Sequence, residues 1–435
     1  MTRYTKGFAV AGAVRPLAVA TLLAGASLAG VAQAATVDTR GGLKLKSDDG
    51  QFEFNVGGRI HLDLDLVSED RDAVFGSALN PASSSPLFRR ARLTFSGKAF
   101  GWEYMFTPDF AQSSGGNLRT ISCLSTPCTV NTSGVAFQEL YLAKALGSGK
   151  LYIGQFTPFR SIEDNTSSNE LTLMERAYTG SMGVYRGGVS RLFQMGLGYQ
   201  MNPTPQTTLG TAVFSLRKDD TPATEGVGAT LRTTWAPVLA ERRVLHLGLS
   251  GSVENPQGDG SSGNVGTVVS YAGIRGPTAN LGQTTGGGKA QYLAGELAGV
   301  YGPFHLQSEI TQARYDQDEL QPVDRSTTLL YHVTVSYALT GESRPYDTRR
   351  GSFRSVVPRS GRGALEVALR HESARNQDAL SPTAVETVST DTLGLTWTLN
   401  PHVRVMANYL LGKAERVDGQ RDEPSALTLR FQMNW

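Results

Sequence analysis

Hydrophobic and polar residues alternate along much of this chain. From residue 52 to residue 66 one set of alternate positions is apolar, and the other set is polar or charged. Successive side chains of a β-strand point to opposite faces, so this pattern predicts a strand with one oily and one wet face. The run is longer than a typical globular strand of about 5–6 residues, and it suits a tilted strand that crosses a membrane. The apolar set is Phe52, Phe54, Val56, Ile60, Leu62, Leu64 and Leu66, and the polar set is Glu53, Asn55, Arg59, His61, Asp63 and Asp65.

The last residues of the chain repeat this alternation. Leu427, Leu429, Phe431, Met433 and Trp435 alternate with polar residues. A strand that ends the chain on an aromatic residue resembles the signal by which outer-membrane barrels are assembled. The alternative is the edge strand of a soluble β-sandwich, but soluble proteins usually blunt an exposed alternating edge of this length.

Similar patterns predict further strands between these two ends. Counting 183–201 as one strand or two gives sixteen or seventeen in all, and we predict sixteen, because closed bacterial barrels have an even number. We therefore predict an all-β fold, a transmembrane antiparallel β-barrel. The further strands are expected near 88–99, 101–111, 135–146, 150–156, 183–201, 207–217, 226–236, 242–254, 290–301, 304–316, 326–340, 363–373, 391–400 and 403–414.

The links between these strands are of two kinds, as in outer-membrane barrels. Short links at 100–101, 302–303 and 400–402 predict periplasmic turns, and the long polar links predict outer loops. The long links are 67–87, 112–134, 157–182, 255–289, 341–362 and 374–390.

The link at 157–182 is a candidate functional loop, because so long a loop in a compact barrel is usually functional. We expect it to fold inward as a constriction lined by Glu163, Asp164, Glu170, Glu175 and Arg176. The alternative is a loop that lies outside, on the rim.

The first residues predict export. Arg3, Lys6 and Arg15 precede a short apolar run at 17–32, and Ala32-Gln33-Ala34 offers a cleavage site. This is the layout of a secretory signal peptide, and the apolar run is too short for a membrane anchor. We predict that residues 1–34 are removed and that residues 35–435 form the barrel domain in the bacterial outer membrane.

Net charge does not indicate a partner. Without the three bases of the leader, 38 Lys+Arg remain against 39 Asp+Glu. Any preference for anions must therefore come from where the bases lie.

The two cysteines, Cys123 and Cys128, are close in sequence, and in an oxidising compartment we expect a local disulfide between them. Two thiols without further nearby ligands do not indicate a metal site.

The six histidines make no recognisable pair with a motif serine, so we predict neither an enzyme nor a cofactor, and no nucleic-acid partner. Outer-membrane lipid is the expected surrounding. An outer-membrane enzyme, a surface-binding barrel and a periplasmic binding sandwich remain the alternatives.

The densest basic cluster is Phe88-Arg89-Arg90-Ala91-Arg92. If Ala91 faces lipid, Arg90 and Arg92 face the lumen, with Arg89 at the end of the strand. Guanidinium groups are always charged, and their planar fork of donors suits phosphate and carboxylate oxygens. The cluster predicts a wet passage that favours anions. Mixed charge in the lumen is the alternative, since Glu53, Asp63 and Glu139 are expected there as well.

Several stretches together resemble the phosphate-selective porin O and P family. They are GGRIHLDLD (57–65), FRRARLTFSGKAFGWEYMFTPDFA (88–111), GKLYIGQFTPF (149–159), TSSNELTLMERA (166–177), SYALTGESRPYDTRRGSF (336–353) and LGLTWTLNPHVRVMANYLLGKAE (393–415). The resemblance implies a sixteen-stranded, homotrimeric outer-membrane porin for small anions such as phosphate or polyphosphate.

The resemblance also implies roles for single residues. Arg89 and Arg90 match the paired arginines of the family's central anion site, and Arg59 and Arg176 match arginines that line the approach to it. Asp164 and Asn169 stand where members selective for phosphate have lysine, and Gln138 replaces an acid. The missing ammonium groups should weaken an orthophosphate site, so the sequence predicts an anion preference without fixing which anion.

Overall fold

Strands make up nearly all of the fold. The computed structural model describes residues 36–38, 42–67, 74, 84–111, 136–180, 184–186, 189–190, 192–216, 226–256, 265–270, 278–285, 288–317 and 324–435. The expected signal peptide and the expected Cys123–Cys128 disulfide lie outside these ranges and stay predictions. Among the described helices, none is long and apolar enough to cross a membrane.

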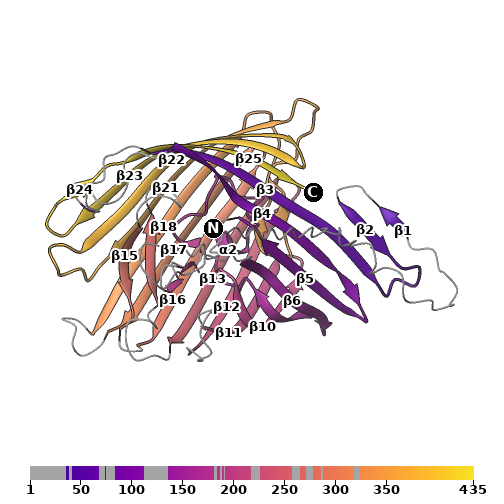
Figure 1. The fold of residues 1–435 in the computed structure, drawn as a ribbon, viewed down its shortest axis with the longest axis horizontal. Helices are drawn as coiled ribbons and strands as arrows, with labels where there is room; N and C mark the ends of the chain where they lie inside the picture. The colour runs from indigo at the N-terminus through magenta and orange to yellow at the C-terminus, as the bar shows by residue number, and fades with distance from the viewer. Residues whose placement is uncertain are drawn as a thin grey trace, which may run out of the picture.

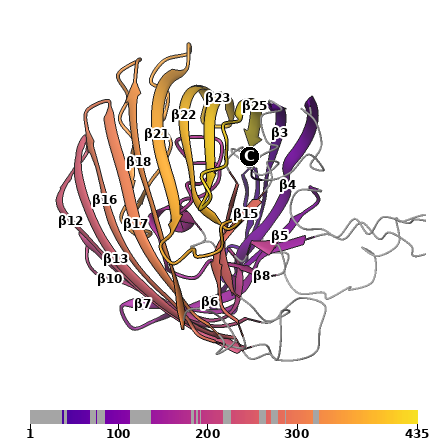
Figure 2. The same ribbon diagram turned by 90° about the vertical axis from the view of Figure 1, so that its left-hand side faces the viewer.

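Sixteen of the described strands form one closed antiparallel barrel (Figures 1 and 2). The first barrel strand pairs with the last, from Ala426 opposite Val67 to Asn434 opposite Arg59. The predicted fold class is therefore confirmed. The barrel strands are β3 Glu53–Val67, β4 Ser84–Ala99, β5 Trp102–Asp109, β6 Ala136–Leu146, β7 Gly149–Phe156, β10 Gln194–Thr204, β11 Thr207–Ser215, β12 Gly226–Ala240, β13 Arg243–Pro256, β16 Ala290–Tyr301, β17 Phe304–Asp316, β18 Arg325–Ala338, β21 Ala364–Asn376, β22 Val385–Asn400, β23 Val403–Arg416 and β25 Ser425–Asn434.

The alternation seen in the sequence sorts side chains to the two faces of the wall. In β3, Leu62 and Leu66 are exposed on the outside, whereas His61 and Asp63 are buried on the inside. In β12, Leu231 is 53% exposed and its neighbour Arg232 is 2% exposed. The outer face offers apolar surface to hydrocarbon, and the inner face carries the polar groups.

The long link 255–289 contains strands among its described residues, although its composition is rich in Gly and Ser. It contains β14 Gly266–Ser270 and β15 Thr278–Gln283, which pair with each other and, through β14, with β8 Val184–Arg186; β8 also pairs with β9 Val189–Ser190. Leu281 packs against inward-facing Tyr315 and Leu330 of the barrel wall. Apolar residues on the inner wall therefore hold this hairpin inside the barrel (Figure 2).

Two predicted outer loops need correction. The link at 341–362 lies at the same end of the barrel as the short turn 302–303, because Tyr337 at the end of β18 pairs with Phe304, the first residue after that turn. This link folds back into the barrel as a small hairpin, β19 Tyr346–Asp347 and β20 Ser352–Phe353. The link predicted at 374–390 is shorter, since β21 ends at Asn376 and β22 begins at Val385.

The remaining strands are short. β1 Thr36–Asp38 and β2 Leu43–Lys46 form a hairpin that extends the sheet beyond β3 (Figure 1), and β24 Arg421–Asp422 pairs with the end of β23.

Candidate functional site

The link that follows β7 lies inside the barrel over its described residues 157–180. It begins with one short helix, α2 Ile162–Asn165, which Ser161 caps by accepting a hydrogen bond from the Asp164 amide at 2.9 Å. Ile162 is fully buried in a cluster that includes Val244 and Phe353. The helix is therefore fixed between the barrel wall and the β19–β20 hairpin.

Arginines of the wall hold the loop by its backbone. Arg404 of β23 donates to the carbonyl oxygens of Asn169 (2.6 Å) and Leu171 (3.0 Å), and Arg370 of β21 donates to that of Glu175 (2.9 Å). A buried carbonyl needs a partner, and a guanidinium offers several donors in a fixed plane. The loop thus has anchors on several strands and a set position in the lumen.

A β-bulge directs both Arg89 and Arg90 into the lumen. Arg90 stands opposite His61, but the next pair is Phe88 opposite Leu62, so Arg89 is the extra residue. Two residues of a bulged strand oppose one on its partner, which breaks the strict alternation of faces. The expectation that Arg89 ends its strand was wrong, because β4 begins at Ser84 and Arg89 lies within it.

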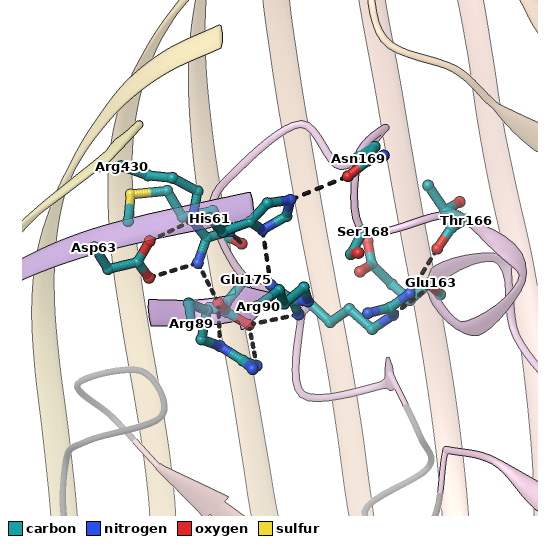
Figure 3. Close-up of polar contacts among 12 residues, drawn as sticks. His61, Asp63, Arg89, Arg90, Glu163, Thr166, Ser168, Asn169, Glu175 and Arg430 are labelled. Atoms are coloured by element: carbon teal, nitrogen blue, oxygen red, sulfur yellow. Dashed lines mark hydrogen bonds and ion pairs between the residues drawn. The ribbon is translucent and has the colours of Figure 1, made fainter. Parts of the chain in front are cut away.

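Glu175 of the loop lies between these arginines (Figure 3). Arg89 contacts it with both arms of its fork, Nε to Oε1 at 2.9 Å and Nη2 to Oε2 at 3.0 Å. Arg90 Nη2 is 3.6 Å from Oε2, and Arg430 Nη2 donates to Oε1 at 2.6 Å. Three guanidinium groups therefore converge on one carboxylate.

The protonation of Glu175 follows from these neighbours. Burial alone would raise the pKa of its carboxyl, but Arg89, Arg90 and Arg430 hold that pKa well below its usual range. Glu175 is therefore ionised throughout the neutral range.

Arg430 and Asp63 belong to the same cluster, although the sequence predicts only a lumen position for Asp63 and no partner for either residue. Arg430 of β25 binds Asp63 of β3 through both arms, each at 2.7 Å, and also donates to the carbonyl oxygen of Met174. The two residues are on neighbouring strands only because the barrel closes there. The available signal was that both residues occupy lumen-facing positions in the alternation of the first and last strands. This predicts the face on which each lies but not its partner.

Arg59 and Arg176 lie near this cluster and have only neutral partners among the described residues. Arg59 donates to the hydroxyl of Ser168 at 2.8 Å, and Arg176 donates to the carbonyl oxygens of Glu163 (2.9 Å) and Thr166 (2.6 Å). The positive charges of Arg92, Arg176 and Arg350 are near enough to repel that of Arg59, and the carboxylate of Glu139 attracts it. Arg350 of the inward 341–362 link is a further lumen base that the sequence analysis did not single out. Among the residues that the structure describes, no direct ion pair neutralises Arg59 or Arg176.

The other predicted site residues have more local partners. Arg92 is paired with buried Asp109, Nε to Oδ2 at 2.6 Å. Glu163 is buried and accepts hydrogen bonds from Gln307 (2.6 Å) and from the Ala177 amide (3.2 Å), while Asp164 is buried near Arg160. Glu163 and Asp164 therefore stabilise the loop from within. Within the described ranges no group of His, Cys, Asp and Glu is arranged to hold a metal ion.

Comparison with known proteins matches residues 54–435 to the family model "Phosphate-selective porin O and P". The chain belongs to this family. Its relatives include porin O of Pseudomonas aeruginosa strain PAO1, 24% identical over 424 residues that cover 91% of each chain. The predicted family and the predicted place in the bacterial outer membrane are confirmed.

Solved structures share the barrel fold of this porin. The outer membrane channel DcaP of Acinetobacter baumannii is 13% identical with a TM-score of 0.56, covering 90% of this chain and 99% of its own. An anion-selective porin from Comamonas acidovorans is 11% identical with a TM-score of 0.56, covering 88% and 100%. OmpT of Vibrio cholerae in a trimer form is 12% identical with a TM-score of 0.50, covering 88% and 99%.

Proposed function

We propose that this porin passes small hydrophilic solutes by passive diffusion and favours anions, among them phosphate or polyphosphate. The observation that carries the proposal is the group of arginines with neutral partners, Arg59 and Arg176, next to the Arg89–Arg90 pair. At an effective dielectric constant of about 20, a unit charge about 8 Å away contributes about 2 kcal/mol before salt screens it. Several such charges in one passage lower the free energy of an anion and raise that of a cation.

Diffusion through the lumen requires no covalent or acid–base chemistry. Catalysis would need a nucleophile beside a base, whereas the described contacts around Arg89 and Arg90 join guanidinium groups to carboxylates and to the imidazole of His61. We therefore propose a channel and not an enzyme, with outer-membrane lipid against the apolar outer face. A homotrimer is part of the proposal, supported by the likeness of the fold to OmpT of Vibrio cholerae in its trimer form; chemical crosslinking in detergent tests it.

The test of the anion preference is the reversal potential of single channels in a planar bilayer under a KCl gradient. We expect the wild-type porin to favour chloride. Replacing Arg89 and Arg90 by Ala leaves Glu175 with Arg430 as its main partner, so the lumen becomes more negative and the reversal potential should shift several-fold in permeability ratio toward K⁺.

The matched control replaces two exposed arginines, Arg375 and Arg421, by Ala. Arg375 pairs with partly exposed Glu386 and Arg421 with exposed Glu423, both outside the cluster, and surface ion pairs of this kind contribute little. A wild-type channel without preference for chloride would contradict the proposal. An equal shift in the control would remove Arg89 and Arg90 from the passage.

A further inference from the structure

The carboxylate of Glu175 occupies the place that the proposed function gives to a permeating anion. Arg89 donates two hydrogen bonds to it, of 2.9 and 3.0 Å, which is the bidentate arrangement in which a guanidinium binds a free carboxylate or phosphate. The Arg430 contact of 2.6 Å completes a three-donor cradle around its Oε1 and Oε2 atoms (Figure 3). The site is therefore filled by an anion that the protein itself supplies.

We propose that Glu175 is a tethered competitor, an internal anion that permeating anions must displace from the arginines. The inference rests on the proposed anion preference and adds a residue that tunes it. Occupation by Glu175 makes the site weaker for solutes, so bound anions leave sooner and conduction is faster. A porin gains throughput from a site that attracts anions without retaining them.

Only the side chain of Glu175 has to move for such an exchange. Its backbone carbonyl is fixed by Arg370 at 2.9 Å, and the preceding carbonyl, of Met174, accepts a hydrogen bond from Arg430. The side chain itself keeps 22% of its surface accessible, whereas the Arg430 side chain keeps 1%. The Glu175 carboxylate is thus more accessible than the arginines that hold it, of which Arg89 keeps 13% and Arg90 4% of its side-chain surface accessible.

The charges of the cluster favour exchange over simple dissociation. Arg89, Arg90 and Arg430 face Glu175 and Asp63. Breaking a buried ion pair and leaving one charge alone is costly. An incoming anion that takes the place of the Glu175 carboxylate avoids this cost, because each guanidinium keeps a partner throughout.

Arg90 offers a donor that Glu175 does not use. Its side chain is buried, and within the described residues its Nε has no hydrogen-bond partner. Its Nη2 is at 3.6 Å from Glu175, too long for a good hydrogen bond. A tetrahedral or multivalent anion could use donors that the tethered carboxylate leaves free.

A purely structural role for Glu175 makes the opposite prediction. If Glu175 served to hold Arg89 and Arg90 in place, its removal would disorder the arginines and weaken anion binding. If it competes, its removal frees the arginines and strengthens binding. The sign of the change therefore separates the two roles.

The experiment measures how inorganic phosphate blocks the chloride current of single channels at neutral pH. In Glu175→Gln the half-blocking concentration should fall roughly tenfold, since a charge-assisted competitor is lost, and the time each phosphate remains bound should lengthen. Glu175→Asp keeps the charge but shortens the side chain by one methylene. Its half-blocking concentration should lie between those of the wild type and Glu175→Gln. If Gln at this position destabilises the barrel, the Asp variant gives the same test.

The matched control is Glu170→Gln, which removes the same charge from the same loop. Glu170 accepts hydrogen bonds from the amide (2.6 Å) and hydroxyl (2.8 Å) of Ser355 and lies outside the Arg89 cradle. An equal change in this control would overturn the proposal in favour of a general charge effect. An unchanged or higher half-blocking concentration in Glu175→Gln would also overturn it. A wild-type channel that does not favour anions would instead defeat the proposed function.

Discussion

At the scale of single residues, the bulge at Arg89 decides the chemistry of the lumen. Strict alternation would send only one of two adjacent arginines inward, but the extra residue between the pairs at His61 and Leu62 brings both to the same side. The loop carboxylate of Glu175 then has two neighbouring forks to bind. One unpaired position in a ladder therefore doubles the positive charge at this level of the channel.

The first prediction at this scale concerns pH. Arginines hold the pKa of Glu175 well below the ordinary value of 4.5. Its negative charge is therefore fully present above pH 4.5 and is lost only as the pH falls through the lowered pKa. The difference in KCl conductance between wild type and Glu175→Gln should therefore stay constant from neutral pH to about pH 4. In an Arg89→Gln background one cation is missing, the pKa of Glu175 rises, and the same difference should shrink over this range. A difference that declines equally in both backgrounds would contradict this electrostatic assignment.

How far the sequence could predict the site follows from the same residues. The alternation alone predicts that His61, Asp63 and Arg430 face the lumen, and all three are buried on that side. The bulge did not, because an inserted residue in a run of arginines leaves no hydrophobic marker. The contact of Arg430 with Asp63 joins residues from opposite ends of the chain, and only barrel closure makes them neighbours.

At the scale of elements, the loop at 157–180 is held by side chains that satisfy its carbonyl groups. The second prediction tests this anchoring through Arg404, whose guanidinium binds two loop carbonyls. In Arg404→Met the apolar stem remains, but the carbonyls of Asn169 and Leu171 lose their partner at a cost of about 1–3 kcal/mol. The loop should loosen, so the open-channel current should become larger and noisier.

The control for this prediction is Arg375→Met. Arg375 makes an exposed ion pair with Glu386, which contributes little to stability. Both variants should keep the heat-modifiable gel migration of a closed barrel. A quiet, wild-type current in Arg404→Met would show that the remaining anchors suffice.

Barrel strands were easier to predict than the inserted elements. The expected strands 290–301 and 304–316 coincide with β16 and β17, where lipid outside and polar lumen inside enforce the alternation. The strands β14 and β15 were missed because they lie inside the barrel and bury apolar residues against its inner wall. The side predicted for the 341–362 link was wrong, because the prediction relied on its length, which is typical of an outer loop. The direction of the strands that it joins decides its side.

At the scale of the whole molecule, the fold depends on closure of the barrel where its first and last strands meet. β25 pairs with β3 in register along its length. Beyond the strand, the amide of Trp435 donates to the carbonyl of Gly58 at 3.1 Å, and the amide of Gly58 donates to that of Trp435 at 3.0 Å. Trp435 therefore holds β25 to β3 through two backbone hydrogen bonds and through the packing of its ring against Gly58.

The last prediction tests this lock through Gly58. A Cβ at Gly58 would lie 2.7 Å from the carbonyl oxygen of Arg92, 2.8 Å from Cη2 of the Trp435 ring and closer still to its Cζ2, so no side chain fits without displacing the ring or the neighbouring strand. Overpacking of this kind typically costs about 1–3 kcal/mol. Gly58→Val should reduce the fraction that refolds into heat-modifiable barrel in detergent and lower the urea concentration at which it unfolds. Gly361→Val is the control, because nothing lies within 4 Å of a Cβ there. If Gly58→Val refolds as fully as the control, closure depends on the strand ladder alone and the terminal tryptophan adds nothing to it.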